Sequence, residues 1–408
     1  MTKTIRKEKI VIFGAGKIGR SFIGQLFSRG GYEVVFIDVY QRIIDELNIR
    51  KNYNVIIKSD KEDIINITNV RGVHGDDASA VAFEVATAAL LAVSVGLHGL
   101  NSIIPLLTKG LQQRFAIDEK SALDIIIAEN MLNADAFFRD ELRKIMPNDY
   151  PFDQLVGLVE TSIGKMVPIM LKKDVEEDIL QVFAEPYNTL ILDRKAFKNP
   201  IPQIFGLSPK ENMKAWVDRK LFIHNLGHAA TAYIGYVYNS GFVFLYEALA
   251  VPAVYELVRE VMIQSSEILL KKYPDEFSRE ALTDHINDLL ERFQNKALGD
   301  TIFRVGCDLF RKLRPEDRLA GAVKAAILFD LPHSKILYAL LCGFHFRATD
   351  EYKEMLPQDI EFVKLYEKDI AEVLATICGF DPIQDCRLFE EARAIDRILS
   401  IQKNKFYL

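Results

Sequence analysis

Four residues with chemically useful side chains lie close together in one apolar stretch: Lys220, His224, Asn225 and His228. In a helix that turns about 100° per residue, Asn225 and His228 would lie about 140° and 80° around the axis from Lys220, on one side over about 12 Å. Lysine can act as a general base when desolvation and a nearby positive charge lower its pKa from about 10.4 to about 7–8. Gly227 costs about 1 kcal/mol relative to alanine inside a helix, which indicates a close approach to this face.

The same stretch also allows a purely structural interpretation. Lys220 would then be solvated, and the histidines would be satisfied core or surface residues. His224, about 40° around the axis from Lys220, fits the geometry as well as His228 does. Spacing alone therefore leaves open both the interpretation and the choice of histidine.

A second motif follows the apolar run Ile10–Phe13 and precedes a helix-compatible segment. It is a Gly-x-Gly-x-x-Gly sequence made of Gly14, Ala15, Gly16, Lys17, Ile18 and Gly19. In dinucleotide sites the first glycine permits a tight turn, the second lets the backbone approach the pyrophosphate, and the third allows close helix–strand packing. We therefore expect these six residues to bind the cofactor.

Asp38 ends the next expected strand, about 20 residues after the motif, where a carboxylate accepts hydrogen bonds from the adenosine ribose. The same carboxylate repels a 2′-phosphate, so we expect NAD rather than NADP. Arg42 could instead hold a 2′-phosphate, which keeps NADP open. The alternative, an ordinary glycine turn with Asp38 as a strand cap, requires three independent features to coincide by chance.

The elements that must position these residues begin with β-branched runs that alternate with helix-compatible segments. This alternation predicts an α/β domain of the Rossmann type, with a doubly wound parallel sheet. The expected strands are Ile10–Phe13, Glu33–Asp38, Leu90–Val95, Asp124–Ala128 and Leu155–Glu160. Two further runs, Ile179–Glu185 and Thr189–Leu192, predict an antiparallel pair added to this sheet.

A segment rich in proline and glycine, from Lys198 to Pro209, predicts the domain boundary. We expect a NAD-binding domain over residues 1–200 and a substrate-binding and catalytic domain over residues 205–408. Ser208 as N-cap and Pro209 at the first helical position predict that a long helix begins there. Apolar residues at helical spacing predict that the second domain is mostly α-helical.

Composition excludes several classes of protein. Hydrophobic residues make up 49% and charged residues 26%, as in globular proteins, and 57 acidic against 51 basic residues give a net charge of −6 that does not favour nucleic acid as a partner. The start of the chain does not resemble a signal peptide, and no apolar run approaches the roughly 18 residues of a membrane span. We expect a cytoplasmic protein with no membrane partner; its oligomeric state cannot be inferred.

Metal and disulfide chemistry are not expected either. The four cysteines, Cys307, Cys342, Cys378 and Cys386, include no Cys-x-x-Cys pair. They fit a reducing compartment, and the chain has no His/Cys/carboxylate cluster at ligand spacing. We therefore expect no metal site.

Lys220, Asn225 and His228 reproduce the Lys-x4-Asn-x2-His pattern of the polyol-specific long-chain dehydrogenases, and the chain resembles the members of that family that act on mannitol 1-phosphate. Other segments that resemble this family, in the same order, are Gly14–Arg20, Phe22–Gly24, Ala128–Met131, Arg311–Leu313, Asp317–Leu319 and His345–Arg347. Ala92–Gly99 and Cys307–Phe310 depart from the family pattern.

The resemblance implies a role for each matched residue in NAD-dependent hydride transfer between mannitol 1-phosphate and fructose 6-phosphate. Lys220 would be the general base, Asn130 and Asn225 would donate hydrogen bonds to the reacting oxygen, and His228 would orient the substrate and Lys220. Asn130 also follows an expected strand, and ligands of open α/β sheets gather at the carboxyl ends of strands. Its alternative role is to start a turn.

Two other functions remain open. The same catalytic set can serve a sugar-acid oxidoreductase of the altronate or fructuronate type. A dinucleotide motif alone shows binding rather than turnover, so a non-catalytic dinucleotide sensor is also possible.

A cluster of basic residues suggests a phosphate on the substrate. It comprises Arg304, Arg311, Lys312, Arg314 and Arg318. Guanidinium groups bind phosphate through paired hydrogen bonds. The alternative is that these residues form surface ion pairs with Asp308, Glu316 and Asp317.

Overall fold

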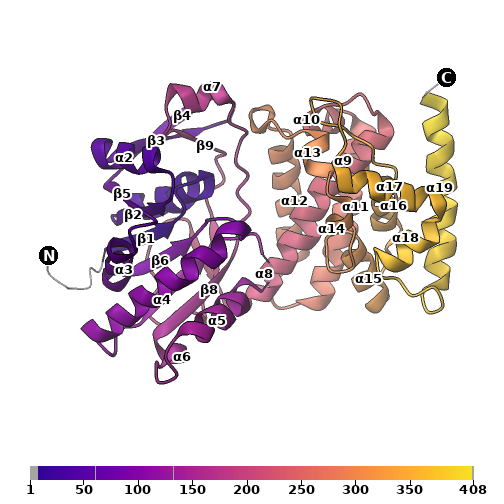
Figure 1. Ribbon diagram of the computed structural model, residues 1–408. Coiled ribbons are helices and arrows are strands. Elements are labelled where there is room, and N and C mark those ends of the chain that lie inside the picture. Colours follow the sequence, from indigo (N-terminus) through magenta and orange to yellow (C-terminus); the bar gives the residue numbers. More distant parts are fainter. Residues whose placement is uncertain (1–7, 60, 132, 407–408) are drawn as a thin grey trace. The chain divides into compact units, whose positions relative to one another are not determined.

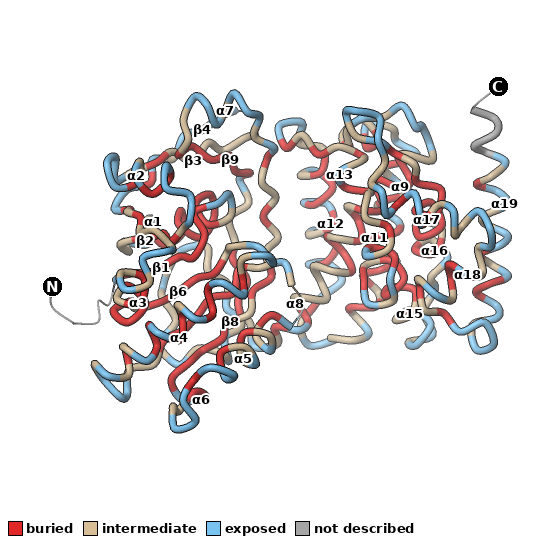
Figure 2. The backbone as a smooth tube through the Cα atoms, viewed as in Figure 1, coloured by how far each residue is buried: buried red, intermediate tan, exposed pale blue. Residues whose placement is uncertain are grey.

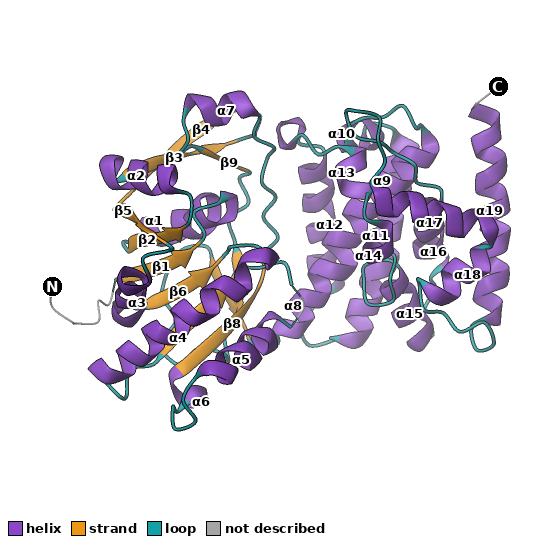
Figure 3. Ribbon diagram, in the orientation of Figure 1, coloured by secondary structure: helices purple, strands orange, loops and turns teal. Residues whose placement is uncertain are grey.

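The computed structural model describes residues 8–59, 61–131 and 133–406. The chain divides into two compact units, residues 1–216 and residues 217–408. Each unit is described by itself below. The described strands lie in the first unit, and the second unit is built from helices (Figure 3).

The main sheet of the first unit has eight strands in the order β11-β10-β8-β7-β6-β1-β2-β5. Their bounds are β1 (Lys9–Phe13), β2 (Glu33–Asp38), β5 (Val70–His74), β6 (Leu90–Val93), β7 (Leu123–Ile127), β8 (Val156–Ser162), β10 (Leu190–Asp193) and β11 (Leu207–Lys210). The six strands from β5 to β8 are parallel, whereas β10 runs antiparallel to β8 and parallel to β11. The expected doubly wound sheet is confirmed.

Helices cover both faces of this sheet because successive side chains of each strand point to opposite sides (Figure 1). In β1, Ile10 and Ile12 belong to one core, and Val11 and Phe13 belong to the other. The helices are the π-helical turn η1 (Gly19–Gly24), α1 (Gln25–Arg29), α2 (Gln41–Arg50), α3 (Ala78–Thr87), the 3-10 turn η2 (Leu97–Gly99), α4 (Leu100–Ile117), α5 (Ala134–Ile145), α6 (Phe152–Leu155) and α7 (Lys172–Glu177).

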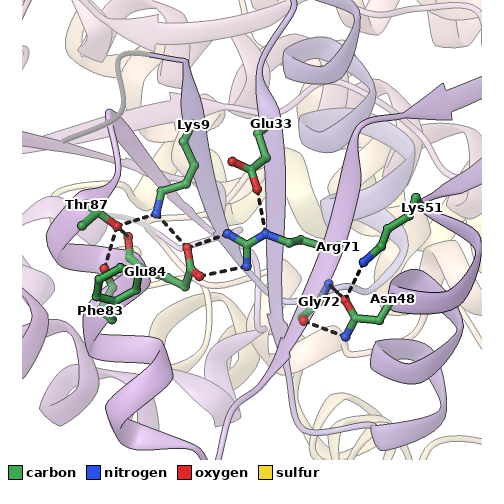
Figure 4. A network of polar contacts seen from close by, with 9 residues as sticks. All are labelled: Lys9, Glu33, Asn48, Lys51, Arg71, Gly72, Phe83, Glu84 and Thr87. Atoms are coloured by element: carbon green, nitrogen blue, oxygen red, sulfur yellow. Dashed lines mark hydrogen bonds and ion pairs between the residues drawn. The ribbon is translucent and has the colours of Figure 1, made fainter. Parts of the chain in front are cut away.

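A buried ion network ties the amino-terminal ends of the strands to α3 (Figure 4). The Lys9 ammonium donates to Glu84 at 2.7 Å and to Thr87 at 2.6 Å, and the guanidinium of Arg71 bonds both oxygens of Glu84 at 2.8 Å. Arg71 also bonds Glu33 at 2.7 Å. The network lies at the end of the sheet opposite to the glycine motif, so its role is to hold strands β1, β2 and β5 to α3.

A smaller sheet has the strand order β4-β3-β9. Strands β3 (Asn52–Ile57) and β4 (Asp63–Thr68) form an antiparallel pair, and β9 (Val182–Ala184) runs parallel to β3. The expected pairing of Ile179–Glu185 with Thr189–Leu192 is wrong, because β9 joins this smaller sheet while β10 joins the main one.

The expected helix start at Pro209 is also wrong. Residues 207–210 form the edge strand β11, which pairs with β10 and tolerates a proline because an edge strand lacks one neighbour. The helix begins instead at Met213, as α8 (Met213–Arg219), and continues through the π-helical turn η3 (Lys220–Asn225) into α9 (Leu226–Tyr238). The breaker-rich segment therefore belongs to the first unit, and the two units divide within α8.

The second unit packs around α9, which is buried along most of its length (Figure 2). Its other helices are α10 (Leu245–Leu249), α11 (Pro252–Lys272), α12 (Arg279–Phe293), η4 (Lys296–Leu298), α13 (Ile302–Gly306), α14 (Leu309–Lys312), α15 (Ala320–Leu328), α16 (Ser334–Phe344), α17 (Pro357–Lys368), α18 (Ile370–Thr376) and α19 (Cys386–Phe406). A Cβ atom on Gly227 would lie 2.6 Å from the sulfur of Met262 in α11, so the close approach at this glycine is made by a packed helix. None of the described helices is long and apolar enough to cross a membrane.

Candidate active site

The glycine motif forms the turn between β1 and η1. Gly14 has a φ of 98°, and a Cβ atom on Gly19 would lie 2.0 Å from the carbonyl oxygen of Gly14, so neither position accepts a side chain. At Gly16, by contrast, no heavy atom lies within 4 Å of the place of a Cβ atom. Gly16 and Lys17 are exposed, and Ile18 is half-buried. The backbone is therefore open at the position where the motif requires a pyrophosphate to approach.

Asp38 lies at the end of β2, beside this turn. Its Oδ2 accepts a hydrogen bond from the amide of Ala15 at 2.7 Å, and its Oδ1 accepts one from the amide of Tyr40 at 2.9 Å. Each carboxylate oxygen has two lone pairs, so Asp38 can still accept hydrogen bonds from ribose hydroxyls. Arg42 is exposed in the first turn of α2.

A cavity of about 290 Å³ lies beside Asp38 and the glycine turn. It is lined by Phe13, Gly14, Gly16, Ile37, Asp38, Val39, Gly75, Asp76, Ser94, Val95, Gly99, Ser102, Ile103 and Leu106. Many of these residues follow the carboxyl ends of parallel strands, where doubly wound sheets bind ligands. Apolar side chains beside two carboxylates fit the adenosine half of a dinucleotide, and the carboxylates oppose an added phosphate.

Asn130 follows β7 and is exposed. The preceding residue, Glu129, accepts a hydrogen bond from the amide of Gly96 at 2.9 Å, which joins the segments after β6 and β7. Burial raises the pKa of Glu129, against the hydrogen bonds from Gly96 and Val95 that lower it. The sequence pattern gave no role to Glu129, because its partner lies on another strand's loop.

Lys220 and Asn225 are the first and last residues of η3. The amide of Leu226 bonds the carbonyl of Leu221, five residues earlier, which is the π-helical pattern. A π-helical turn winds less per residue than an α-helix, so the 140° offset expected for Asn225 does not apply. The α-helical spacing on which the sequence prediction rested therefore does not describe the relation of Lys220 to Asn225.

The environment of Lys220 favours its neutral form. Burial and, to a smaller extent, the positive charge of Arg318 together lower its pKa to about 8. Arg318 is held by Asp317, because the Nε of Arg318 donates a hydrogen bond to Oδ1 of Asp317 at 2.7 Å. The Nη1 of Arg318 lies 3.5 Å from the carbonyl oxygen of Asn225. Lys220 can therefore accept a proton near neutral pH.

The two candidate histidines have different surroundings. His228 Nε2 lies 3.0 Å from Oδ2 of the buried Asp300, and its ring stacks on Phe293 with centroids 4.8 Å apart. His224 is buried and packs edge-on against Phe293 at 5.7 Å. Burial lowers the pKa of both imidazoles well below the ordinary value. Nearby cations act in the same direction, and for His228 the cation with the largest effect is Arg304.

The basic residues considered for a phosphate have partners within the second unit. Arg304 pairs with Asp300, Arg311 with Asp308, Arg314 with Glu316 and Arg318 with Asp317, and Lys312 donates to the carbonyl of Val305 at 2.7 Å. The structure thus contains ion pairs with Asp308, Glu316 and Asp317, the alternative to a phosphate site. A guanidinium has five N–H donors, so one carboxylate does not occupy it fully. Among the residues that the structure describes, no group of three or more His, Cys, Asp or Glu could hold a metal ion.

Two family models together match most of the chain. A mannitol dehydrogenase Rossmann domain matches residues 8–206, and a mannitol dehydrogenase C-terminal domain matches residues 212–394. The chain belongs to the mannitol dehydrogenase family. It is an oxidoreductase of the polyol type.

Solved structures of other polyol dehydrogenases share the fold. The mannitol 2-dehydrogenase of Pseudomonas fluorescens, in a ternary complex with NAD and D-mannitol, is 16% identical and has a TM-score of 0.73, covering 100% of this chain and 96% of that one. A D-sorbitol dehydrogenase in substrate-free form is 15% identical and has a TM-score of 0.79, covering 98% and 95%.

Within this mannitol dehydrogenase family member, the candidate residues fall into two groups. The first unit carries the glycine motif, Asp38 and Asn130, and the second carries Lys220, Asn225 and His228. The sequence did not indicate that Asp300 bonds His228, because the two lie 72 residues apart. The sequence does contain a local indication that Asp300 is paired, because Arg304 follows it by four residues, across the N-cap of α13.

Proposed function

We propose that this protein is a NAD-dependent mannitol-1-phosphate 5-dehydrogenase, which interconverts mannitol 1-phosphate and fructose 6-phosphate. The observation that carries the proposal is Lys220, with a pKa of about 8, one π-helical turn before Asn225 in a chain of the mannitol dehydrogenase family. A lysine with this pKa is a competent general base at neutral pH.

In polyol oxidation, the neutral Nζ of Lys220 takes the proton of the reacting hydroxyl. The hydrogen on the same carbon leaves with its electron pair, and the carbon–oxygen bond becomes a carbonyl. NAD⁺ supplies the acceptor for that hydride. While the reacting oxygen carries negative charge, Asn225 donates a hydrogen bond to that oxygen, and we propose the same role for Asn130. In the reverse reaction the Lys220 ammonium returns the proton.

The surroundings of Asp38 support NAD as the cofactor. Asp38 and Asp76 both line the cavity beside the glycine turn. A 2′-phosphate placed there would meet two carboxylates, whereas ribose hydroxyls would find acceptors.

The basic residues around the catalytic helix support an anionic substrate, because a guanidinium paired with one carboxylate keeps further N–H donors. The positive groups that act on His228 are Arg304, Arg318, Lys312 and Arg292, and burial lowers the pKa of Lys312 to about 8. The family resemblance favours a phosphate at this end of the substrate. The same cations suit the carboxylate of a sugar acid, which makes a sugar-acid oxidoreductase the second candidate.

A substrate panel tests the proposal. NADH formation is measured with NAD⁺ and mannitol 1-phosphate, mannitol, altronate or, in the reverse direction with NADH, fructose 6-phosphate and fructuronate. We expect kcat/KM to be highest for the phosphate pair. A higher value for altronate and fructuronate would establish the second candidate, and equal values for mannitol and its phosphate would remove the phosphate from the proposal. Binding of NAD without turnover of any of these compounds would indicate a sensor.

A further inference from the structure

Asp300 is a buried carboxylate with two polar partners in the second unit. Its side chain is 4% exposed, and its Oδ2 lies 3.0 Å from Nε2 of His228. Its Oδ1 pairs with the guanidinium of Arg304, one helical turn later. Its backbone carbonyl is also engaged, because it accepts a hydrogen bond from the amide of Leu245 at 3.0 Å. The carboxylate is thus held in place on several sides.

The charge balance defines what the carboxylate can do. A buried carboxylate needs a compensating positive charge, and the Arg304 guanidinium supplies it. His228 is therefore not required as a counter-ion and can stay neutral; burial and the charge of Arg304 both lower the pKa of its imidazole. A neutral imidazole carries one proton, and the acceptor at Nε2 places that proton on Nε2.

We propose that Asp300 is a positioning residue for the reaction: it fixes His228 as the tautomer protonated at Nε2, with Nδ1 left as a hydrogen-bond acceptor. This inference rests on the proposed function of His228. The stacking of the His228 ring on Phe293, with an interplanar angle of 22°, fixes the ring plane, while Asp300 fixes the rotation within that plane. Together they hold the ring in one orientation, with a single lone pair, on Nδ1, left as the acceptor.

The substitution Asp300→Asn separates this role from simple packing. Asparagine has nearly the same shape, but its amide nitrogen can donate to Nε2 and stabilise the other tautomer. We expect kcat for the best substrate to fall about 100-fold, the scale of a misplaced catalytic group, with KM for NAD unchanged. Asp300→Glu retains a carboxylate and is expected to recover part of the lost kcat.

The tautomer is measured directly by nitrogen NMR of protein labelled with ¹⁵N-histidine. The chain has seven histidines, so the signal of His228 is assigned as the one lost in His228→Gln. We expect the wild-type signal to have the Nε2-protonated pattern from about pH 6 to about pH 8, on both sides of the ordinary histidine pKa of about 6.5. In Asp300→Asn we expect the Nδ1-protonated pattern. This measurement needs no turnover, so it remains valid if the substrate assignment is wrong.

Asp396→Asn is the matched control. Asp396 in α19 bonds Nε2 of His345 at 2.8 Å, so the variant breaks a second imidazole–carboxylate pair of the same unit. We expect its kcat and the His228 signal to match wild type. The proposal is overturned if Asp300→Asn keeps a wild-type kcat, or if the His228 signal shows the Nδ1-protonated form in the wild-type protein. It is also overturned if Asp396→Asn loses kcat to the same extent, because the effect would then be one of stability.

Discussion

Beyond the effect of burial, the guanidinium of Arg318 helps to lower the pKa of the Lys220 ammonium to about 8. Arg318 is itself fixed by two hydrogen bonds to Asp317, one from its backbone amide and one from Nε, each 2.7 Å long. The positive charge of Arg318, which lowers the pKa of Lys220, is therefore fixed within the folded second unit. It acts on Lys220 before any ligand binds.

The rate of polyol oxidation should follow the neutral fraction of Lys220. Because the pKa is lowered to about 8, the neutral base is scarce below that pH and predominant above it. We expect kcat for oxidation to rise with pH and level off above about pH 8, and kcat for ketose reduction, which needs the ammonium, to fall over the same range. Initial rates in both directions from pH 6 to 10 measure this. Profiles with the same slope in both directions would exclude a single lysine acid–base group.

The substitution Arg318→Gln should move that profile. Removing the positive charge makes the ammonium of Lys220 more stable, so the pKa rises and the oxidation profile shifts to higher pH. Arg314→Gln, which breaks a neighbouring exposed pair with Glu316, is the control and should leave the midpoint in place. An unshifted midpoint in Arg318→Gln would mean that burial alone sets the pKa.

The substitution Asp38→Asn should weaken NAD binding and reduce the preference for NAD over NADP. The amide loses the charge that repels a 2′-phosphate, and it accepts hydrogen bonds less well from Ala15 and the ribose. We expect a loss of about 10-fold in NAD affinity, the scale of one charged hydrogen bond. Titration calorimetry with both cofactors measures it, with Asp45→Asn in the following helix α2 as control. Unchanged affinities for both cofactors would remove Asp38 from the site.

The substitution Glu84→Ala should lower the stability of the fold. It leaves Lys9, which is 1% exposed, without its carboxylate partner, and it removes both bonds to Arg71. Breaking a buried pair costs about 3–5 kcal/mol, so thermal unfolding should shift to a clearly lower temperature. Activity per folded molecule should be retained at low temperature, because the network lies at the opposite end of the sheet from the glycine turn. Glu62→Ala, which breaks an exposed pair with Lys58, is the control and should unfold as wild type does.

The fold was largely predictable because the strands that form the centre of the main sheet carry continuous β-branched runs, as β1 and β7 do. The helix start at Pro209 was mispredicted because Ser208 and Pro209 match a capping pattern, whereas pairing with β10, a tertiary contact, makes them an edge strand. Local patterns are overridden in this way when a neighbouring strand supplies backbone partners.

The candidate site was predictable only in part. The positions of Lys220, Asn225 and His228 along the chain suggested a shared face, but the π-helical turn that contains the first two depends on hydrogen bonds that α-helical periodicity does not describe. The partners Asp300 and Arg318 were not predictable as such, because each reaches the catalytic helix from a separate part of the chain.

The kinetics of Lys220→Ala test the central claim most directly. We expect kcat for oxidation of mannitol 1-phosphate to fall about 10²–10⁴-fold, because the variant lacks the base, while the dissociation constant for NAD stays at the wild-type value. Lys364→Ala, which breaks an exposed pair with Glu361, controls for the loss of a lysine. A Lys220→Ala enzyme that retains kcat within a few-fold of wild type would contradict the account.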